Sequence, residues 1–333
     1  MISMTYPEWE KLCTTHSEEH AVNAFDPNAI IRFRLGKDNN RQLQYLDNVL
    51  FAKRPDINLF IQPAFVDNQT NKFQAYSKED FDTLSRLKHL RKLSVPIAVK
   101  QNFQDFPAIG FITKLSIYAD IKTDLHLLEI FPDISYLHLQ GKFTEVTSLS
   151  RLQKLNGLSV SGFKQVDFSG LTGLKLKTLS ISDCEASENF DMLLSGSVEK
   201  LTLSGIKKVE NIGFIANATG LRKLYLDSFS LPALPCFSKN QKLTALQINE
   251  MHKLDHIESL IDSDIEYLFV LVSADKVPAK AFAETLMKMK KLKKALMRLM
   301  DRNEKRYITL KRYLEKNGKE DLLSEDMNFF QII

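Results

Sequence analysis

The sequence lacks several features that mark secreted and membrane proteins. It has three cysteines, Cys13, Cys184 and Cys236, among 333 residues. An odd number of widely separated cysteines does not suit a disulfide framework. The first twenty residues contain no apolar core of a signal peptide, and no run of 18 uncharged apolar residues occurs anywhere. We therefore expect a cytoplasmic protein without a membrane span.

Motifs of common enzyme classes are also absent. The chain has no P-loop, no GxGxxG turn and no CxxC pair. The string from His16 to His20 (HSEEH) matches the HxxEH pattern of inverted zinc proteases, in which two histidines one helical turn apart hold the metal. This match has little weight because no third ligand is evident, so we favour a surface helix. We expect no metal, no cofactor and no enzymatic activity.

What the chain does contain is a six-residue phrase, LxxLxL, with Ile or Val allowed at each apolar position. It returns nine times between Leu90 and Val270, in steps of 21 to 23 residues. Its middle apolar residues are Leu93, Leu115, Leu137, Leu158, Leu179, Leu201, Leu224, Leu246 and Leu268. Such a period is typical of a solenoid, in which each coil covers the apolar side of the next. Because side chains alternate along a strand, the second and third apolar residues of each phrase should point inward.

The flanks of the repeat predict two caps. Ile31 to Leu35 and Ile57 to Ile61 alternate as strands do, and the residues between them have helical spacing. After Pro278, apolar residues at helical spacing continue to Leu299, and a second helix is predicted near 304–316. The predicted parts are an N-terminal cap at 1–62, a loop and entry helix at 63–86, nine repeats at 87–273 and a C-terminal helical cap at 274–333.

These phrases resemble those of leucine-rich-repeat proteins of the 22-residue class, as found in the internalin-like repeat domains of bacteria. The resemblance covers residues 90–270, and phrases such as LSVSGF look most like cytoplasmic bacterial repeat proteins of unassigned function. It implies an α/β solenoid, a leucine-rich-repeat horseshoe with one parallel β-sheet on the concave face. Short 3₁₀ or α turns would lie on the convex side, with an N-terminal α/β cap and a helical C-terminal cap.

The sequence departs from this class at one position of the repeat. The family commonly places Asn, or sometimes Cys, three residues after the third apolar position, where the side chain satisfies backbone groups of the neighbouring turn. The corresponding residues here are Phe163, Cys184, Ile206, Phe229 and Met251. Only Cys184 fits the motif. We therefore expect an apolar spine at these positions and a different pairing for the backbone groups beside it.

The side chains that alternate toward the concave face form the predicted binding surface, because leucine-rich repeats mostly bind through that side. The candidate binding residues are Lys114, Tyr118, Tyr136, His138, Ser159, Ser180, Lys200, Lys223, Tyr225, Asp227, Tyr267 and Phe269. A floor of small residues is predicted between them: Gly157, Ser159, Ser161, Thr178, Ser180 and Ser182. The aromatic residues would anchor a protein or peptide partner, and the lysines would favour an acidic one. The alternative is that Ser and Thr are simply tolerated on an exposed sheet.

We accordingly predict a non-catalytic scaffold for protein–protein interaction, whose oligomeric state the sequence leaves open. One alternative is nucleic-acid or anionic-membrane binding by the C-terminal cap, since Lys276 to Glu320 hold 15 Lys or Arg against 5 Asp or Glu. Its lysines equally suit the solvated face of a cap helix, which we favour. A second alternative is a hydrolase in which His138 serves Ser116 or Ser159, although no orienting acid or oxyanion site is evident nearby.

Overall fold

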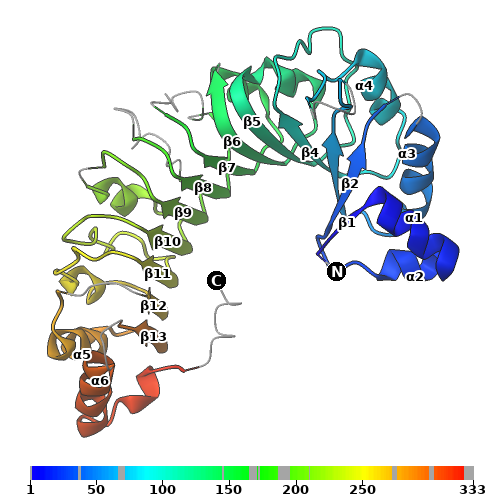
Figure 1. Ribbon diagram of the computed structural model, residues 1–333. Helices are drawn as coiled ribbons and strands as arrows, with labels where there is room; N and C mark the ends of the chain where they lie inside the picture. The colour runs from blue at the N-terminus through cyan, green and yellow to red at the C-terminus, as the bar shows by residue number, and fades with distance from the viewer. Residues whose placement is uncertain are drawn as a thin grey trace. The chain divides into compact units, whose positions relative to one another are not determined.

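Parallel strands occur at the predicted phrases along the chain. The computed structural model describes residues 2–36, 39–66, 72–144, 146–164, 171, 173–186, 196–209, 211–271, 276–299 and 304–325. The chain divides into two units, Met1–Phe163 (unit 1) and Lys164–Ile333 (unit 2), and each is considered by itself. Within each unit, the paired strands are parallel and follow one another in sequence order (Figure 1). This strand order is the one that a repeating coil produces.

Unit 1 combines strands with short helices. Its described elements are β1 (Ser3–Thr5), α1 (Tyr6–Thr15), α2 (Glu18–Asn23), β2 (Ile30–Arg34), α3 (Asn40–Leu46), the π-helical turn η2 (Asp47–Phe51), β3 (Asn58–Gln62), α4 (Lys78–Ser85), β4 (Lys92–Ile97), β5 (Lys114–Asp124), η3 (Leu125–Ile130), β6 (Tyr136–Thr144), η4 (Val146–Arg151) and β7 (Gly157–Ser161). The turns η3 and η4 are 3₁₀ helices. They confirm the prediction of single turns between strands.

The N-terminal strands extend the sheet of the repeats. The two alternating segments form β2 and β3 with helical segments between them, as predicted, and β3 pairs with β4 in register. The sequence did not predict β1 or α1. At the start of α1, the backbone N–H of Thr5 donates to Glu8 Oε2 at 2.7 Å, and Trp9 on this helix is fully buried. A satisfied helix start and one large apolar anchor account for α1.

A buried carboxylate joins η2 to the start of the repeats. Asp47 is 3% exposed, and its oxygens accept the backbone N–H groups of Lys88, His89 and Leu90 at 2.7 to 3.2 Å. These three N–H groups precede β4 and would otherwise be left without acceptors. Asp47 therefore fixes the backbone from which the repeat sheet begins.

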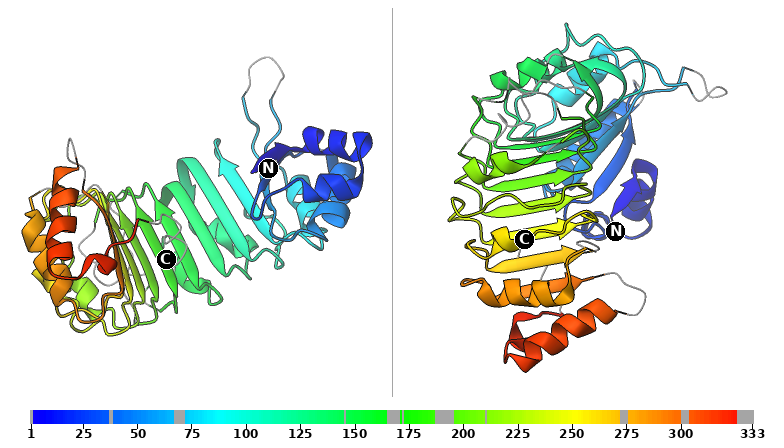
Figure 2. Two further views of the ribbon diagram at one scale, coloured as in Figure 1. Left: turned by 90° about the horizontal axis from the view of Figure 1, so that it is seen from below. Right: turned by 90° about the vertical axis from the view of Figure 1, so that its left-hand side faces the viewer.

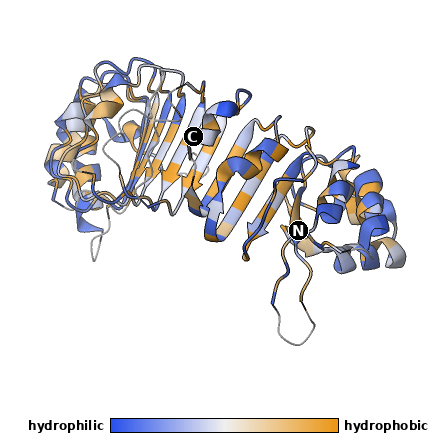
Figure 3. Ribbon diagram, turned by 90° about the horizontal axis from the view of Figure 1, so that it is seen from above, coloured by the Kyte–Doolittle hydropathy of each residue, from blue (hydrophilic) through white to orange (hydrophobic). Residues whose placement is uncertain are grey.

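The apolar alternation predicted from the phrase is confirmed in both units. Leu137 and Leu139 of β6 are fully buried, as are Leu224 and Leu226 in unit 2. Figure 3 shows the resulting bands of hydrophobic and hydrophilic residues along the strands. Burying such a leucine side chain stabilises the fold by about 1.5–3 kcal/mol, so a phrase repeated in every coil strongly specifies which face is inside.

Unit 2 continues the pattern with shorter strands. Its described elements are β8 (Thr178–Ser182), β9 (Lys200–Ser204), η7 (Gly213–Asn217), β10 (Lys223–Asp227), β11 (Ala245–Asn249), η8 (Glu258–Leu260), β12 (Tyr267–Leu271), α5 (Ala279–Lys288), β13 (Lys294–Arg298), α6 (Lys305–Lys316) and η9 (Glu320–Leu322). Figure 2 shows these strands as one layer, with α5 and α6 following β12. The fold of the described chain is a leucine-rich-repeat solenoid, as predicted.

The prediction for the C-terminal part was wrong at one element. A helix was expected to continue to Leu299, but α5 ends at Lys288 and β13 follows. Leu292, Ala295 and Met297 occupy the three apolar positions of the phrase, and Ala295 pairs in register with Leu268 of β12. Ala and Met lie outside the Leu, Ile or Val set, so this copy was missed. The second helix was correctly predicted and is α6.

The expected apolar spine is present in unit 2, where backbone hydrogen bonds take the place of the asparagine ladder that is common in the family. Cys184, Ile206, Phe229 and Met251 are all buried. Each follows a residue in the left-handed region: Asp183 (φ 53°), Gly205 (φ 59°), Ser228 (φ 58°) and Glu250 (φ 48°). The backbone N–H groups of the four left-handed residues donate to carbonyl groups at the ends of the next strands, at 2.9 to 3.1 Å. The turn itself thus satisfies the groups that a side-chain amide satisfies elsewhere.

Candidate functional site

The twelve candidate residues lie on strands of both units. Their side chains belong to the sheet face opposite the leucine core, called here the outward strand face of each unit. In unit 1 they are Lys114 and Tyr118 on β5, Tyr136 and His138 on β6, and Ser159 on β7. In unit 2 they are Ser180 on β8, Lys200 on β9, Lys223, Tyr225 and Asp227 on β10, and Tyr267 and Phe269 on β12.

Three rings lie in a row on the outward strand face of unit 1. The ring centroids of Phe60 and Tyr118 are 6.0 Å apart, and those of Tyr118 and His138 are 5.6 Å apart. Phe60 belongs to β3 and reaches Tyr118 across β4, where its register partner is the small residue Ser94. The sequence analysis missed Phe60 because β3 carries no full copy of the phrase. Its place in an alternating strand was the available signal.

A fourth ring, that of Tyr136, covers the glycine of the next strand. Gly157 is the register partner of Tyr136, and a Cβ atom on Gly157 would overlap the tyrosine ring. Lys114, on the other side, places its Nζ 6.0 Å from the centre of the same ring. At Gly157, the surface of the predicted small-residue floor is therefore covered by the ring of Tyr136. The other floor residues are divided between the two units, so a shared floor remains a prediction.

One predicted Ser–His pair is present in unit 1. His138 Nδ1 lies 3.0 Å from Ser159 Oγ, so these two of the three predicted side chains are hydrogen-bonded. Burial lowers the pKa of His138, whereas a hydrogen bond with Gln140 acts in the opposite direction. Within the described part of the chain, no carboxylate is hydrogen-bonded to His138. An orienting acid, which a hydrolase requires, is therefore not found beside this pair.

Two lysines lie side by side at the edge of the same face. Lys92 on β4 and Lys114 on β5 are register partners. The Nζ of Lys92 donates to Asn28 Oδ1 at 2.6 Å and to the carbonyl oxygen of Asp56 at 2.9 Å, whereas Lys114 is exposed. Burial and the charge of Lys114 together lower the pKa of Lys92. The charge of Lys114 thus disfavours the charged form of its neighbour Lys92.

In unit 2, the predicted polar residues form a network within the sheet. Both oxygens of Asp227 are hydrogen-bonded, one by Ser204 Oγ and the other by Asn249 Nδ2, each at 2.7 Å. Burial, and then the charge of Asp227, raise the pKa of Tyr225. Lys200 and Lys223 are register partners on β9 and β10. Asp227 thus holds three strands together, which is a structural role that the sequence analysis did not anticipate.

One candidate residue is hidden from solvent. Alternation predicted that Phe269 would be exposed on the outward strand face, but it is fully buried, and its register partner Leu296 is 3% exposed. Phe269 therefore has no surface with which to contact a partner in this conformation. Its neighbour Tyr267 is half-buried, with Lys293 Nζ 5.8 Å from its ring centre. Phe269 and Leu296 therefore belong to the packed interior of unit 2.

The lysines of the C-terminal part are partly neutralised. Lys291 pairs with Asp264 at 2.8 Å and Lys293 with Glu266 at 2.7 Å. Lys294 donates to the carbonyl oxygen of Asp321. Within the basic segment from Lys276 to Glu320, the residues through which nucleic acid would be bound are Lys288, Lys290, Lys291, Lys293, Lys294 and Arg298. Because three of these six already have acceptors, the structure gives this alternative no support.

The HSEEH string forms a helix start. Ser17 caps α2 by accepting the backbone N–H of His20 at 3.1 Å, and the rings of His16 and His20 stack with centroids 4.6 Å apart. Among the described residues, no three His, Cys, Asp or Glu side chains gather as metal ligands. In the same part of the chain, none of the helices has the length and apolar character needed to cross a membrane.

Comparisons with known proteins find similar solved structures at low sequence identity. No protein-family model and no curated protein matches the chain. Its structure is similar to an internalin (inlF) of Listeria monocytogenes, with 15% identity and a TM-score of 0.45 over 97% of this chain and 94% of that one. For internalin C2 of the same species, identity is 17% and the TM-score 0.37, over 68% and 84% of the two chains. For a chain of the mouse RP105/MD-1 complex, identity is 13% and the TM-score is 0.41, over 98% of this chain and 69% of that one.

Proposed function

We propose that the protein is a non-catalytic scaffold that binds a protein or peptide on its outward strand faces. The principal anchor would be the aromatic surface of unit 1, defined by Phe60, Tyr118, Tyr136 and His138. A cytoplasmic location accompanies this proposal, since three widely separated cysteines suit a reducing compartment. The leucine-rich-repeat fold favours interaction in general, because it presents a long row of side chains on a rigid sheet.

The observation that carries the proposal is the fixed, half-exposed arrangement of these rings. Tyr118 and His138 contact one another, Tyr136 lies over Gly157, and each ring keeps part of its surface in solvent. Aromatic side chains supply large contact areas with few rotamers. Rings already held by neighbouring strands lose little further entropy on binding. Such a surface is suited to binding a partner without rearrangement.

The lysines beside the rings indicate the partner's charge. Lys92 and Lys114 place two ammonium groups on adjacent strands, and Lys114 is exposed. A carboxylate from a partner would relieve the repulsion between them and would also speed the encounter. We therefore propose a partner segment with an acidic group next to an apolar or aromatic one.

Capture from the source cell followed by titration tests this function. The immobilised protein would be compared with a Tyr118→Ala/Tyr136→Ala variant, and the captured protein, once identified, would be titrated by calorimetry. We expect about a tenfold or greater loss of affinity in the variant, because buried aromatic anchors dominate such interfaces. The matched control is Tyr307→Ala/Tyr313→Ala on α6, which should bind as the wild type does. Equal affinity of the face variant and the wild type would refute the site.

The acidic character of the partner has its own test. Lys114→Glu should weaken binding of the identified partner, and the difference from wild type should shrink as salt is added, because an exposed charge is screened. Lys142→Glu, on β6 and also exposed, is the control for the change in net charge. If both variants bind the partner with equal affinity, the partner does not contact Lys114.

A further inference from the structure

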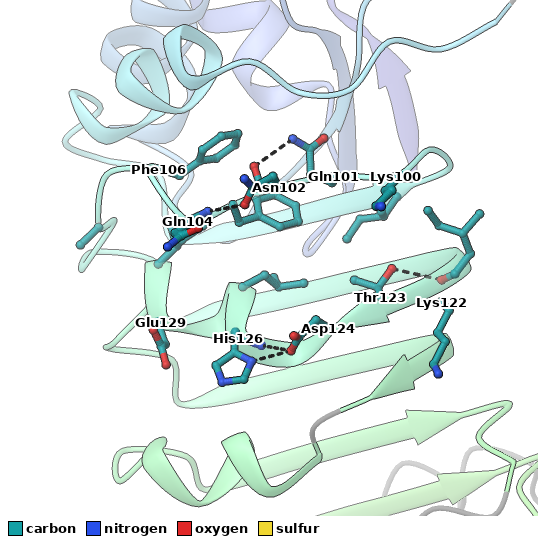
Figure 4. Close-up of a pocket in the computed structure, with 16 residues that line it drawn as sticks. Lys100, Gln101, Asn102, Gln104, Phe106, Lys122, Thr123, Asp124, His126 and Glu129 are labelled. Carbon is teal, nitrogen blue, oxygen red and sulfur yellow. Dashed lines mark hydrogen bonds and ion pairs between the residues drawn. The ribbon is translucent and has the colours of Figure 1, made fainter.

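Unit 1 also contains a cavity whose lining does not include the residues of the aromatic surface. This cavity of about 730 Å³ lies between the loop that follows β4 and the C-terminal half of β5 together with η3 (Figure 4). The loop, residues 98–113, contains no helix, whereas the next two coils carry η3 and η4. The strand β5 is also unusually long, with 11 residues against 5 in β7. A missing helix and an extended strand together leave the cavity.

The cavity has an apolar wall. Phe103 and Phe106 line it, with their ring centroids 5.2 Å apart, and Phe106 packs on the buried Phe81 at 4.7 Å. From the opposite side, Ile121 and Leu127 contribute aliphatic surface. The volume falls in the range of about 300–1,000 Å³ that is common for small-molecule sites. An apolar body of moderate size would be held against these side chains.

Two lysines supply the unbalanced charge. Lys100 from the loop and Lys122 from β5 line the cavity, and Figure 4 shows both toward one end in that view. Both are exposed, and neither forms an ion pair within the described part of the chain. The two residues come from opposite walls of the cavity, and both side chains are exposed. Because a lysine side chain is long and flexible, each ammonium group can turn toward a bound anionic group.

The acidic residues of the cavity are already engaged. Asp124 accepts the backbone N–H of His126 at 2.8 Å, and its Oδ1 lies 2.7 Å from His126 Nδ1. Glu129 pairs with Arg151. Each carboxylate thus has a partner inside unit 1, while the two lysines remain available. The charged side chains of the cavity without an ion pair or hydrogen bond in the described part of the chain are therefore both cationic, and they favour an anionic group at the end where they lie.

We propose that this cavity binds a small amphipathic anion: a carboxylate or phosphate group held by Lys100 and Lys122, attached to an apolar body that packs against Phe103 and Phe106. Charge-assisted hydrogen bonds from two ammonium groups orient the head group, and the apolar wall supplies contact area. Specificity comes from the combination, because a neutral analogue gains only the apolar contacts and a bare anion only the ionic ones.

A matched pair of fluorescent probes tests this site in the full chain. Anilinonaphthalene sulfonate carries an anion on an apolar body, and N-phenyl-naphthylamine is the same body without the charge. The wild type should bind the sulfonate saturably at one site. The Lys100→Ala/Lys122→Ala variant should bind it about tenfold more weakly, yet bind the neutral probe as before. The proposal would be overturned if this variant bound the sulfonate as tightly as the wild type does, or if its affinity for both probes fell equally.

Three further arms locate the site and identify the head group. Lys142→Ala/Lys175→Ala changes the net charge equally outside the cavity and should leave sulfonate affinity unchanged. Ala108→Trp should fill the cavity and weaken both probes; unchanged binding of both would place the probe elsewhere and refute the site. Competition with naphthoate and naphthyl phosphate separates carboxylate from phosphate recognition, and failure of both to displace the sulfonate counts against the proposal. Thermal melting confirms that each variant is folded.

Discussion

The ring of Tyr136 lies on the backbone of Gly157, its register partner on the neighbouring strand of unit 1. A glycine in a strand interior weakens a sheet unless something occupies the space of its missing side chain. Here the tyrosine occupies it, and Lys114, the register partner of Tyr136 on β5, places its Nζ 6.0 Å from the ring centre. The orientation of a proposed anchor residue therefore depends on a glycine.

The first prediction follows from this contact. Gly157→Ala should displace Tyr136 and destabilise the protein by about 1–3 kcal/mol, as overpacked sites do. Urea denaturation measures the free energy of unfolding, and tyrosine fluorescence reports the displaced ring. Gly173→Ala is the matched control, because a Cβ at Gly173 meets no atom within 4 Å. A Gly157→Ala variant as stable as this control would show that Tyr136 does not depend on the glycine.

The second prediction concerns the left-handed turns beside the apolar spine. Ser228 has φ 58°, a conformation that costs an L-residue about 1–2 kcal/mol and glycine nothing. Ser228→Gly should stabilise the protein by about 0.5 kcal/mol after the greater entropy of unfolded glycine is counted. Ser230→Gly, two residues later and outside the left-handed region, should be neutral or destabilising. The denaturation midpoint should therefore rise for Ser228→Gly and stay unchanged or fall for Ser230→Gly, and a fall for Ser228→Gly or an equal rise for both would contradict the turn argument.

Sequence periodicity predicted the fold because each coil must bury the same apolar positions. Leu137 and Leu139 are fully buried as expected, and the alternating segments around Ile31 and Ile61 form β2 and β3. The strand β13 escaped prediction since Ala295 stands where the other coils have Leu. In the fold, Ala295 still pairs with Leu268 and is fully buried, so it occupies the same position as the leucines of the other coils.

The candidate site could be predicted only as a face, not as a set of contacts. Alternation correctly grouped Tyr118, Tyr136 and His138, because it depends on each strand alone. It could not show that Phe60 crosses β4 above Ser94, nor that Phe269 is buried. These outcomes depend on the sizes of side chains on neighbouring coils. The cavity of unit 1 was also missed, because it results from a helix that one coil lacks.

The third prediction concerns Asp47, whose carboxylate accepts three backbone N–H groups before β4. Asp47→Ala should leave these buried donors without acceptors and cost about 3 kcal/mol or more of unfolding free energy. Amide hydrogen exchange should show early loss of protection at Lys88 to Leu90. Asp82→Ala, which removes only an exposed pair with Lys78, should change stability by about 0.5 kcal/mol or less. Equal effects of both substitutions would exclude the proposed role of Asp47.

The fourth prediction concerns the pH dependence of stability through His138. Burial lowers the pKa of His138 in the folded protein below its ordinary value of 6.5. On acidification, the unfolded chain therefore takes up this proton first, so the free energy of unfolding falls as the pH drops through 6.5. The loss in the free energy of unfolding reaches its limit once His138 is protonated in the folded protein as well.

His138→Asn removes this titration while keeping a polar side chain beside Ser159. Between about pH 7.5 and about pH 5.5, the variant should lose less stability than the wild type, as measured by urea denaturation at several pH values. The NMR signal of the His138 ring should titrate with a midpoint below 6.5. A midpoint at or above this value would show that burial does not dominate the pKa of His138, and the predicted loss of stability on acidification would be refuted.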